Sequence, residues 1–147
     1  MRARLAWLLQ LLAAAALAVT AYLHADLYVH SYRVIPKVGV AFLLQASAGF
    51  AIAALLPLCR LLLMRIAAAA LSAATLGGFI MSRTVGVLGF TEHGWEPAPQ
   101  AALSVVAEIG TLLLLVVAIG LADGPRLLGL LGALSRRPRI GELDSAA

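Results

Sequence analysis

Four long segments without formal charge dominate the pattern of hydrophobic and polar positions along the chain. Charges are absent for 21 residues after Arg4, 22 after Lys37, 17 after Arg65 and 26 after Glu96, the last with one exception, Glu108. A bilayer core about 30 Å thick is crossed by roughly 20 helical residues. The runs are continuous rather than alternating, which favours helices over barrel strands. The pattern predicts four membrane-spanning helices, at Leu5–Leu23, Val38–Leu58, Leu61–Ser82 and Pro99–Leu121.

Arg65 stands inside the third predicted span. A long basic side chain near a helix end can extend its charged group to the lipid headgroups while its stem stays in the apolar region. The third segment is long enough to cross the membrane only if Arg65 snorkels toward the headgroups, and we expect it to do so.

Composition agrees with this pattern and excludes several classes of protein. Of 147 residues, 63% are hydrophobic and 12% are charged, whereas soluble domains carry about 25% charged residues. A chain this small and apolar lacks the polar surface of a soluble enzyme, a disordered regulator or a secreted disulfide scaffold. Its single cysteine, Cys59, also excludes a thiol oxidoreductase that needs paired cysteines.

The basic residues predict the orientation of the chain. An even number of spans places both termini on one side, which then carries eight Arg residues, against three Lys or Arg residues on the other, outer side. By the positive-inside rule, we expect a multi-pass protein of the cytoplasmic (inner) membrane with cytoplasmic N- and C-termini. The excess of Lys and Arg over Asp and Glu then reflects membrane topology, and we expect no nucleic-acid partner. Arg2 and Arg4 before an apolar run also resemble a signal peptide, but the run is long for one and we expect it to be retained.

The C-terminal part is predicted to lie outside the spans. We expect an all-α fold with a four-helix transmembrane domain over residues 1–123, followed by an interfacial helix and a basic cytoplasmic tail over 124–147. The apolar stretch Arg126–Leu134 is too short to cross a membrane, and the arginines after it suit anionic headgroups.

A polar site is predicted near the middle of the membrane. Gln45 and Glu108 each stand nine residues after a proline that precedes a span, about 13.5 Å deep. A carboxyl at this depth is costly and marks a functional site by default. Gln100, Ser104, Glu108 and Thr111 share one helical face. The candidate site comprises Glu108, Gln45, Ser104 and Thr111; alternatively, Glu108 is a structural residue hydrogen-bonded to Gln45 or reached by Arg83.

Polar residues also gather on the predicted outer side. The candidate cluster contains His24, Asp26, His30, Tyr32, Arg83, Glu92 and His93. Histidines with carboxylates suit Zn²⁺ or Cu²⁺, with His24, His30 and His93 as candidate ligands. Their spacing matches no ligand motif, however, and interfacial His and Tyr are ordinary membrane anchors, so we expect no cofactor.

The second outer loop, residues 83–95, has two interpretations. It could fold back over the mouth of the bundle as a lid, which is tolerated where protein shields the backbone. The plainer interpretation, which we prefer, is an interfacial loop anchored by Phe90 and Trp95.

Two stretches carry a resemblance to known proteins. YRVIPKVGVAFLLQ at Tyr32–Gln45, with His24 before it and GVLGFTE at Gly86–Glu92 after it, resembles small, uncharacterised four-span integral membrane proteins of high-GC bacteria. The resemblance covers roughly His24 to Glu108 and implies an architecture without an activity. The plan is also similar to that of DoxX-like membrane proteins, in overall architecture alone.

Three functions remain open. The leading hypothesis is a small accessory or structural subunit that acts through helix–helix contacts with a membrane-protein partner or a second copy of itself, within the lipid bilayer. The alternative is a small proton- or cation-coupled transporter with its site at Glu108 and Gln45. A quinone- or lipid-active membrane enzyme using Glu108 is the third hypothesis.

Overall fold

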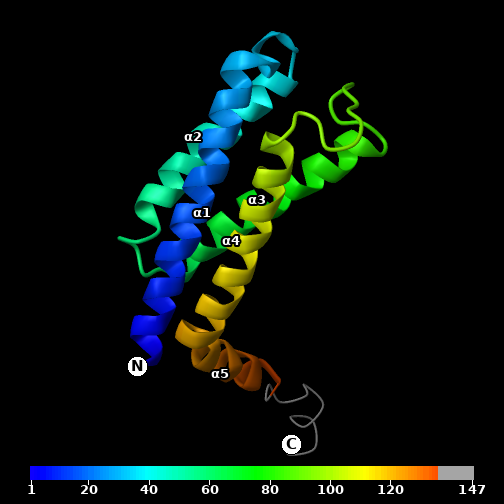
Figure 1. Cartoon of the computed structure of the whole chain (residues 1–147). Coiled ribbons are helices and arrows are strands. Elements are labelled where there is room, and N and C mark those ends of the chain that lie inside the picture. Colours follow the sequence, from blue (N-terminus) through cyan, green and yellow to red (C-terminus); the bar gives the residue numbers. More distant parts are fainter. Residues whose placement is uncertain (136–147) are drawn as a thin grey trace, which may run out of the picture.

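The computed structural model describes residues 1–135, and these form an all-helical bundle (Figure 1). The predicted basic tail, from Arg136 onward, lies outside the described residues. The elements are α1 (Arg2–His30), a short 3-10 helix η1 (Tyr32–Val34), α2 (Val38–Leu55), α3 (Leu62–Arg83), α4 (Gln100–Ala122) and α5 (Gly124–Ser135). The predicted four-helix bundle with a short fifth helix is therefore confirmed.

The four long helices form a ring in which neighbours in sequence are also neighbours in space. Helix α1 packs against α2 and α4, and α3 completes the ring by contacting α2 and α4. Figure 1 shows the N-terminus and α5 at one end of the bundle, which we call the N-terminal end. The α1–α2 and α3–α4 connections lie at the other, which we call the loop end. Four spans thus bring both described ends of the chain to the same side.

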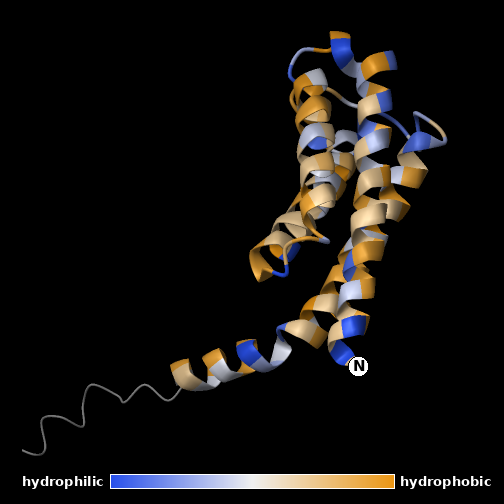
Figure 2. Ribbon diagram, turned by 90° about the vertical axis from the view of Figure 1, so that its left-hand side faces the viewer, coloured by the Kyte–Doolittle hydropathy of each residue, from blue (hydrophilic) through white to orange (hydrophobic). Residues whose placement is uncertain are grey.

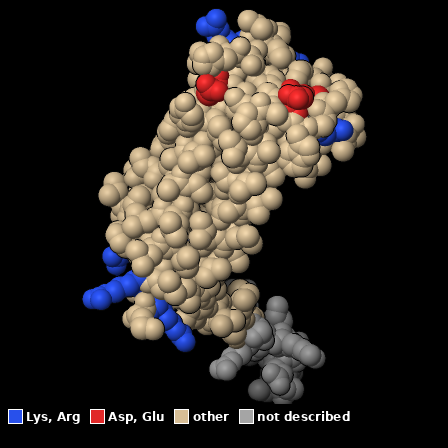
Figure 3. All heavy atoms as spheres, viewed as in Figure 1, with Lys and Arg blue, Asp and Glu red and all other residues tan. Residues whose placement is uncertain are grey.

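Helices α1 to α4 are each long and apolar enough to cross a membrane. Figure 2 shows mainly apolar residues along these helices, and in Figure 3 the charged residues gather toward the two ends of the visible face with an uncharged belt between them. This distribution identifies the chain as a membrane protein, because a belt without charge matches the hydrocarbon region of a bilayer.

Close packing between helices relies on small residues. A Cβ added at Gly49 of α2 would stand 2.8 Å from the Cβ of Ala21 on α1, so only glycine allows this approach of the two helices. Around it, the apolar interior is built from Ala13, Leu17, Leu56, Ala68 and Leu115. Small residues at such crossings are the usual means by which helices associate in membranes, where the lipid supplies no hydrophobic drive between them.

Helix α1 is longer than its predicted span. It runs to His30 instead of ending near Leu23, because Leu27 remains buried against Tyr32 and Val38. Asp26 and His30, one turn apart, form a surface pair with Nδ1 3.0 Å from Oδ1. The charges after residue 23 therefore mark no helix end; they lie on the surface of a continuing helix.

The expectation that Arg65 snorkels toward the headgroups is wrong. Arg65 is 4% exposed, and its guanidinium Nη1 lies 2.5 Å from Oδ2 of Asp123, where α4 ends. The counter-charge inside the bundle replaces the hydration that Arg65 would otherwise reach at the membrane surface.

Helix α5 leaves the end of α4 and runs away from the bundle axis (Figure 2). Its apolar side chains are exposed, among them Leu128, Leu130, Leu131 and Leu134. A short apolar helix at the end of a membrane bundle, turned across the bundle axis, suits the predicted position at the membrane interface.

Candidate functional site

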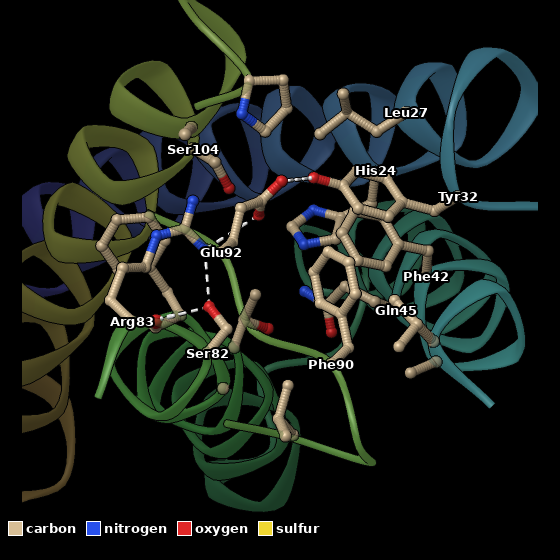
Figure 4. A pocket seen from close by; sticks show the side chains of 18 of the residues that line it. His24, Leu27, Tyr32, Phe42, Gln45, Ser82, Arg83, Phe90, Glu92 and Ser104 are labelled. Carbon is tan, nitrogen blue, oxygen red and sulfur yellow. Dashed lines mark hydrogen bonds and ion pairs between the residues drawn. The ribbon is translucent and has the colours of Figure 1, made fainter. Parts of the chain in front are cut away.

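The loop end of the bundle encloses a cavity of about 260 Å³. All four long helices contribute to its walls, and the α3–α4 loop contributes to its mouth. The lining includes His24 from α1, Tyr32 from η1, Phe42 and Gln45 from α2, Phe79, Ser82 and Arg83 from α3, Ser104 and Glu108 from α4, and Phe90 and Glu92 from the loop. Figure 4 labels all of these side chains except Phe79 and Glu108.

Glu108 is the buried carboxyl of this cavity. It is 1% exposed, and its Oε1 accepts a hydrogen bond of 2.9 Å from the hydroxyl of Ser104, one turn earlier on α4. Within residues 1–135, no Lys, Arg or His forms an ion pair with it. Since a buried carboxylate is costly unless it is paired, Glu108 must hold a proton or receive a partner from outside the described chain.

Gln45 is a second buried polar residue of the cavity, after Glu108, and its hydrogen-bonding capacity is not fully used. It is 9% exposed, and its amide nitrogen has no hydrogen-bond partner among the described residues. Figure 4 shows it below His24 and Phe42. A buried amide left unpartnered costs about 1–3 kcal/mol, and such a group on a cavity wall is a ready contact for a bound molecule.

The predicted mid-membrane site is only partly brought together. Glu108, Gln45 and Ser104 line the same cavity, whereas Thr111 does not and donates a 2.8 Å hydrogen bond to the carbonyl of Ala107 in its own helix. Neither partner named in the structural alternative is in place: within residues 1–135, Glu108 makes no hydrogen bond with Gln45 and no ion pair with Arg83. A protonated structural Glu108 stays a prediction.

His24 lines the cavity with one ring nitrogen already engaged. Its Nδ1 lies 2.9 Å from the carbonyl oxygen of Thr20. A carbonyl only accepts, so Nδ1 carries the hydrogen and Nε2 of the neutral ring is an acceptor. The ring also lies 5.1 Å from that of Phe42. This arrangement holds a hydrogen-bond acceptor in the cavity wall.

Tyr32, Arg83 and Glu92, from three different elements, contact one another at the mouth of the cavity. The Tyr32 hydroxyl donates to Oε1 of Glu92, and Nη1 of Arg83 lies 3.1 Å from the other carboxylate oxygen (Figure 4). Burial, and then the bond to Glu92, raise the pKa of Tyr32. The backbone N–H of Glu92 donates to the carbonyl of Ser82 at 2.9 Å. Arg83 and Glu92 neutralise each other at the entrance.

The loop therefore lies over the bundle mouth, and the preferred interfacial interpretation is wrong for Phe90. Its ring packs edge-on against Tyr32 at 5.8 Å, inside the mouth. Gly86 and Gly89 adopt φ of 84° and 81°, which permits the tight reversal between them. Trp95 is 58% exposed, as an interfacial anchor would be.

The three histidines proposed as metal ligands lie in three different settings. His24 faces the cavity, His30 pairs with Asp26 on the surface, and His93 is exposed in the α3–α4 loop. Within residues 1–135, no group of three or more His, Cys, Asp or Glu side chains is placed to hold a metal ion. The predicted outer cluster is thus divided between the cavity mouth and the exterior.

Sequence reasoning missed a second buried polar cluster, near the N-terminal end. Arg65 donates through Nε to Oε1 of Gln10 at 2.8 Å and pairs with Asp123. The Gln10 amide donates in turn to the carbonyls of Leu56 and Cys59. The only signal in the sequence was a glutamine inside an apolar run, and its partners are 46 to 55 residues away.

Comparisons of the chain with family models, with curated proteins and with solved structures found no match. The resemblance to small four-span membrane proteins stays a prediction.

Proposed function

We propose that the protein is a small proton-coupled membrane carrier in which Glu108 holds either a proton or a bound molecule. The observation that carries this proposal is a fully buried carboxyl in the wall of a cavity, with no ion-pair partner among residues 1–135. This observation favours the transporter hypothesis over the accessory-subunit hypothesis.

The coupling follows from the cost of an unpaired charge in an apolar interior. An ionised Glu108 without a partner is disfavoured by several kcal/mol, so the carboxyl favours its protonated form when no guest is bound. A guest that interacts with the ionised form displaces that proton, and a proton displaces the guest. Two ligands that exclude each other at one site are thermodynamically coupled, which is the requirement for exchange.

The two ends of the bundle supply the barriers that a carrier needs. Toward the loop end, Tyr32, Glu92 and Arg83 close the mouth through side-chain contacts at the edge of a loop. Toward the N-terminal end, the apolar cluster around Leu17, Leu56 and Leu115 fills the space between the helices. Opening of the first barrier needs loop movement alone, whereas opening of the second needs helices to shift.

The other hypotheses have less support. The outer surface of a membrane bundle is apolar whether lipid or protein covers it, so the exposed helix faces do not favour a partner subunit. The accessory role, the homo-oligomer, the inner-membrane location and the cytoplasmic termini stay predictions.

Proton exchange in liposomes tests the proposal. Protein is reconstituted with an internal pH-sensitive dye, and a panel of small organic cations, anions and neutral molecules is added outside. We expect at least one compound to move protons through the wild type and not through Glu108→Gln. Glu96→Gln is the matched control, because Glu96 is an exposed carboxyl of the same loop end outside the cavity wall. If no compound moves protons, or if Glu108→Gln exchanges as well as the wild type, the carrier proposal is wrong.

A further inference from the structure

The charges that face the cavity leave one carboxyl without a counter-charge. At the mouth, Arg83 and Glu92 form an ion pair 3.1 Å long, and the Tyr32 hydroxyl is occupied by Glu92. On α1, His24 presents an acceptor because its Nδ1–H is bonded to Thr20. On α4, Glu108 has only the Ser104 hydroxyl. A guest that completes this set carries a single positive charge.

The wall of the cavity near its mouth is aromatic. The rings of Tyr32 and Phe42 are stacked with centroids 4.3 Å apart, and Phe90 meets Tyr32 edge-on. On α3, the ring of Phe79 already has the Arg83 guanidinium 4.1 Å from its centroid. Aromatic faces attract cations and pack against other rings. The wall therefore suits a guest that has both a ring and a positive charge.

The volume sets the size of that guest. A dry engineered cavity of about 150 Å³ in another protein takes up benzene. The present cavity, at about 260 Å³, has space for one aromatic ring and a substituted ammonium group beside it. A molecule with two or more fused rings and long side arms exceeds this space.

Gln45 shows where the polar part of the guest lies. Its side chain is nine-tenths buried, lines the cavity and has an amide nitrogen without a partner in residues 1–135. Rotation of the terminal amide can instead present its oxygen, whose partial negative charge attracts an ammonium group with or without N–H donors. Gln45 on α2 and Glu108 on α4 therefore supply polar groups to the cavity from two different helices.

From these observations we infer that the cavity binds a monovalent aryl-ammonium cation, with the ammonium at Glu108 and the ring among Phe42, Tyr32 and Phe90. The inference rests on the proposed carrier function and names its substrate class. When the cation binds, the carboxyl of Glu108 gives its proton to water and the ammonium takes its place. One cation exchanges for one proton, so the exchange moves no net charge.

Binding of two matched probes tests the substrate class. Benzyltrimethylammonium is the cation, and N,N-dimethylbenzylamine N-oxide is its neutral analogue, with an oxygen in place of one methyl group. Titration calorimetry on purified protein at pH 8 should give a Kd for the cation that is about tenfold or more below that of the N-oxide, the scale of close charge pairs at interfaces. Glu108→Gln should remove this difference, and Glu96→Gln should preserve it.

The pH dependence of binding provides a second test. Protons compete for Glu108, so the affinity for the cation should fall as the pH is lowered. The affinity for the N-oxide should not fall, because its oxygen can accept a hydrogen bond from the protonated carboxyl. Equal binding of the two probes by the wild type, or a cation affinity that is the same at every pH and in folded Glu108→Gln, would overturn the inference.

The results also separate this inference from the carrier proposal. If only neutral or anionic compounds move protons in liposomes, the protein is a carrier and the substrate class is wrong. If the cation binds through Glu108 but no proton crosses the membrane, the substrate class stands and the carrier proposal fails.

Discussion

The two buried polar clusters of this bundle are built in opposite ways. Near the N-terminal end, Arg65 is held between Asp123 and Gln10, and the Gln10 amide binds two backbone carbonyls. At the loop end, Glu108 accepts one hydrogen bond, from the Ser104 hydroxyl, and the Gln45 amide nitrogen has no partner among residues 1–135. Both clusters lie among four apolar helices, but only in the first is each charged side chain paired with an opposite charge.

This difference separates a structural cluster from a binding site. A buried network in which each charge is paired gives the helices a fixed arrangement, and the loss of one member leaves the others exposed to a full desolvation penalty. A buried group left unpaired next to a cavity lowers stability and is retained where a guest completes it. Substitutions at corresponding positions of the two clusters should therefore have opposite consequences.

The largest effect is expected for Arg65→Met. It leaves the Asp123 carboxylate buried without its partner, which costs about 3–5 kcal/mol. The free energy of unfolding, measured by titration with SDS in mixed micelles, should fall by this amount. The double variant Arg65→Met/Asp123→Leu should recover most of the loss, because it leaves no uncompensated charge. A single variant as stable as the wild type would show that the pair contributes nothing to the fold.

The same substitution at the two glutamines gives the sharpest comparison. Gln10→Met removes the donor to the carbonyls of Leu56 and Cys59 and a partner of Arg65, and should cost about 1–3 kcal/mol. Gln45→Met removes an amide whose nitrogen is already unpartnered, and should leave stability unchanged or raise it slightly. Unfolding of the two variants under identical conditions measures both. Equal losses would abolish the distinction between the clusters.

A smaller loss than that of Gln10→Met is expected at the mouth of the cavity. Tyr32→Phe removes the hydrogen bond to Glu92, at a cost of about 1 kcal/mol. The folded pKa of Tyr32 is raised above its ordinary value of about 10. Its contribution to stability is therefore present at neutral pH and is lost as the pH rises above about 10.

Two measurements check this prediction. In a spectrophotometric titration of folded protein, the phenolate absorbance that Tyr32→Phe removes should belong to the part that appears well above pH 10. The stability difference between the two proteins should also shrink at alkaline pH. Removal of an absorbance step centred near pH 10 would show that Tyr32 is not held in this way.

The sequence predicted the parts of the structure that depend on local pattern. Charge-free runs define the four helices to within a few residues at most ends, because the length of an apolar run is set by the thickness of the membrane it crosses. Helical periodicity likewise brought Ser104 and Glu108 together one turn apart.

The parts that failed depend on pairing across the fold. The partner of Arg65 is 58 residues away in the chain, and nothing local distinguishes an arginine that snorkels from one that meets a carboxylate. Phe90 was expected in the interface because a loop aromatic has no periodicity that reveals its face. Thr111 shares the helical face of Glu108 but lies beyond the floor of the cavity, whose depth is set by packing.

The position of Asp123 has a consequence for the synthesis of the protein. Arg65 enters the membrane with the third helix, yet its carboxylate is the last residue of the four-helix ring to be synthesised. A product that stops before this point leaves the Arg65 guanidinium without a counter-charge, with the side-chain oxygen of Gln10 as its hydrogen-bond acceptor. The ion pair therefore forms only once the fourth helix has been made, so the charge of Arg65 is neutralised last.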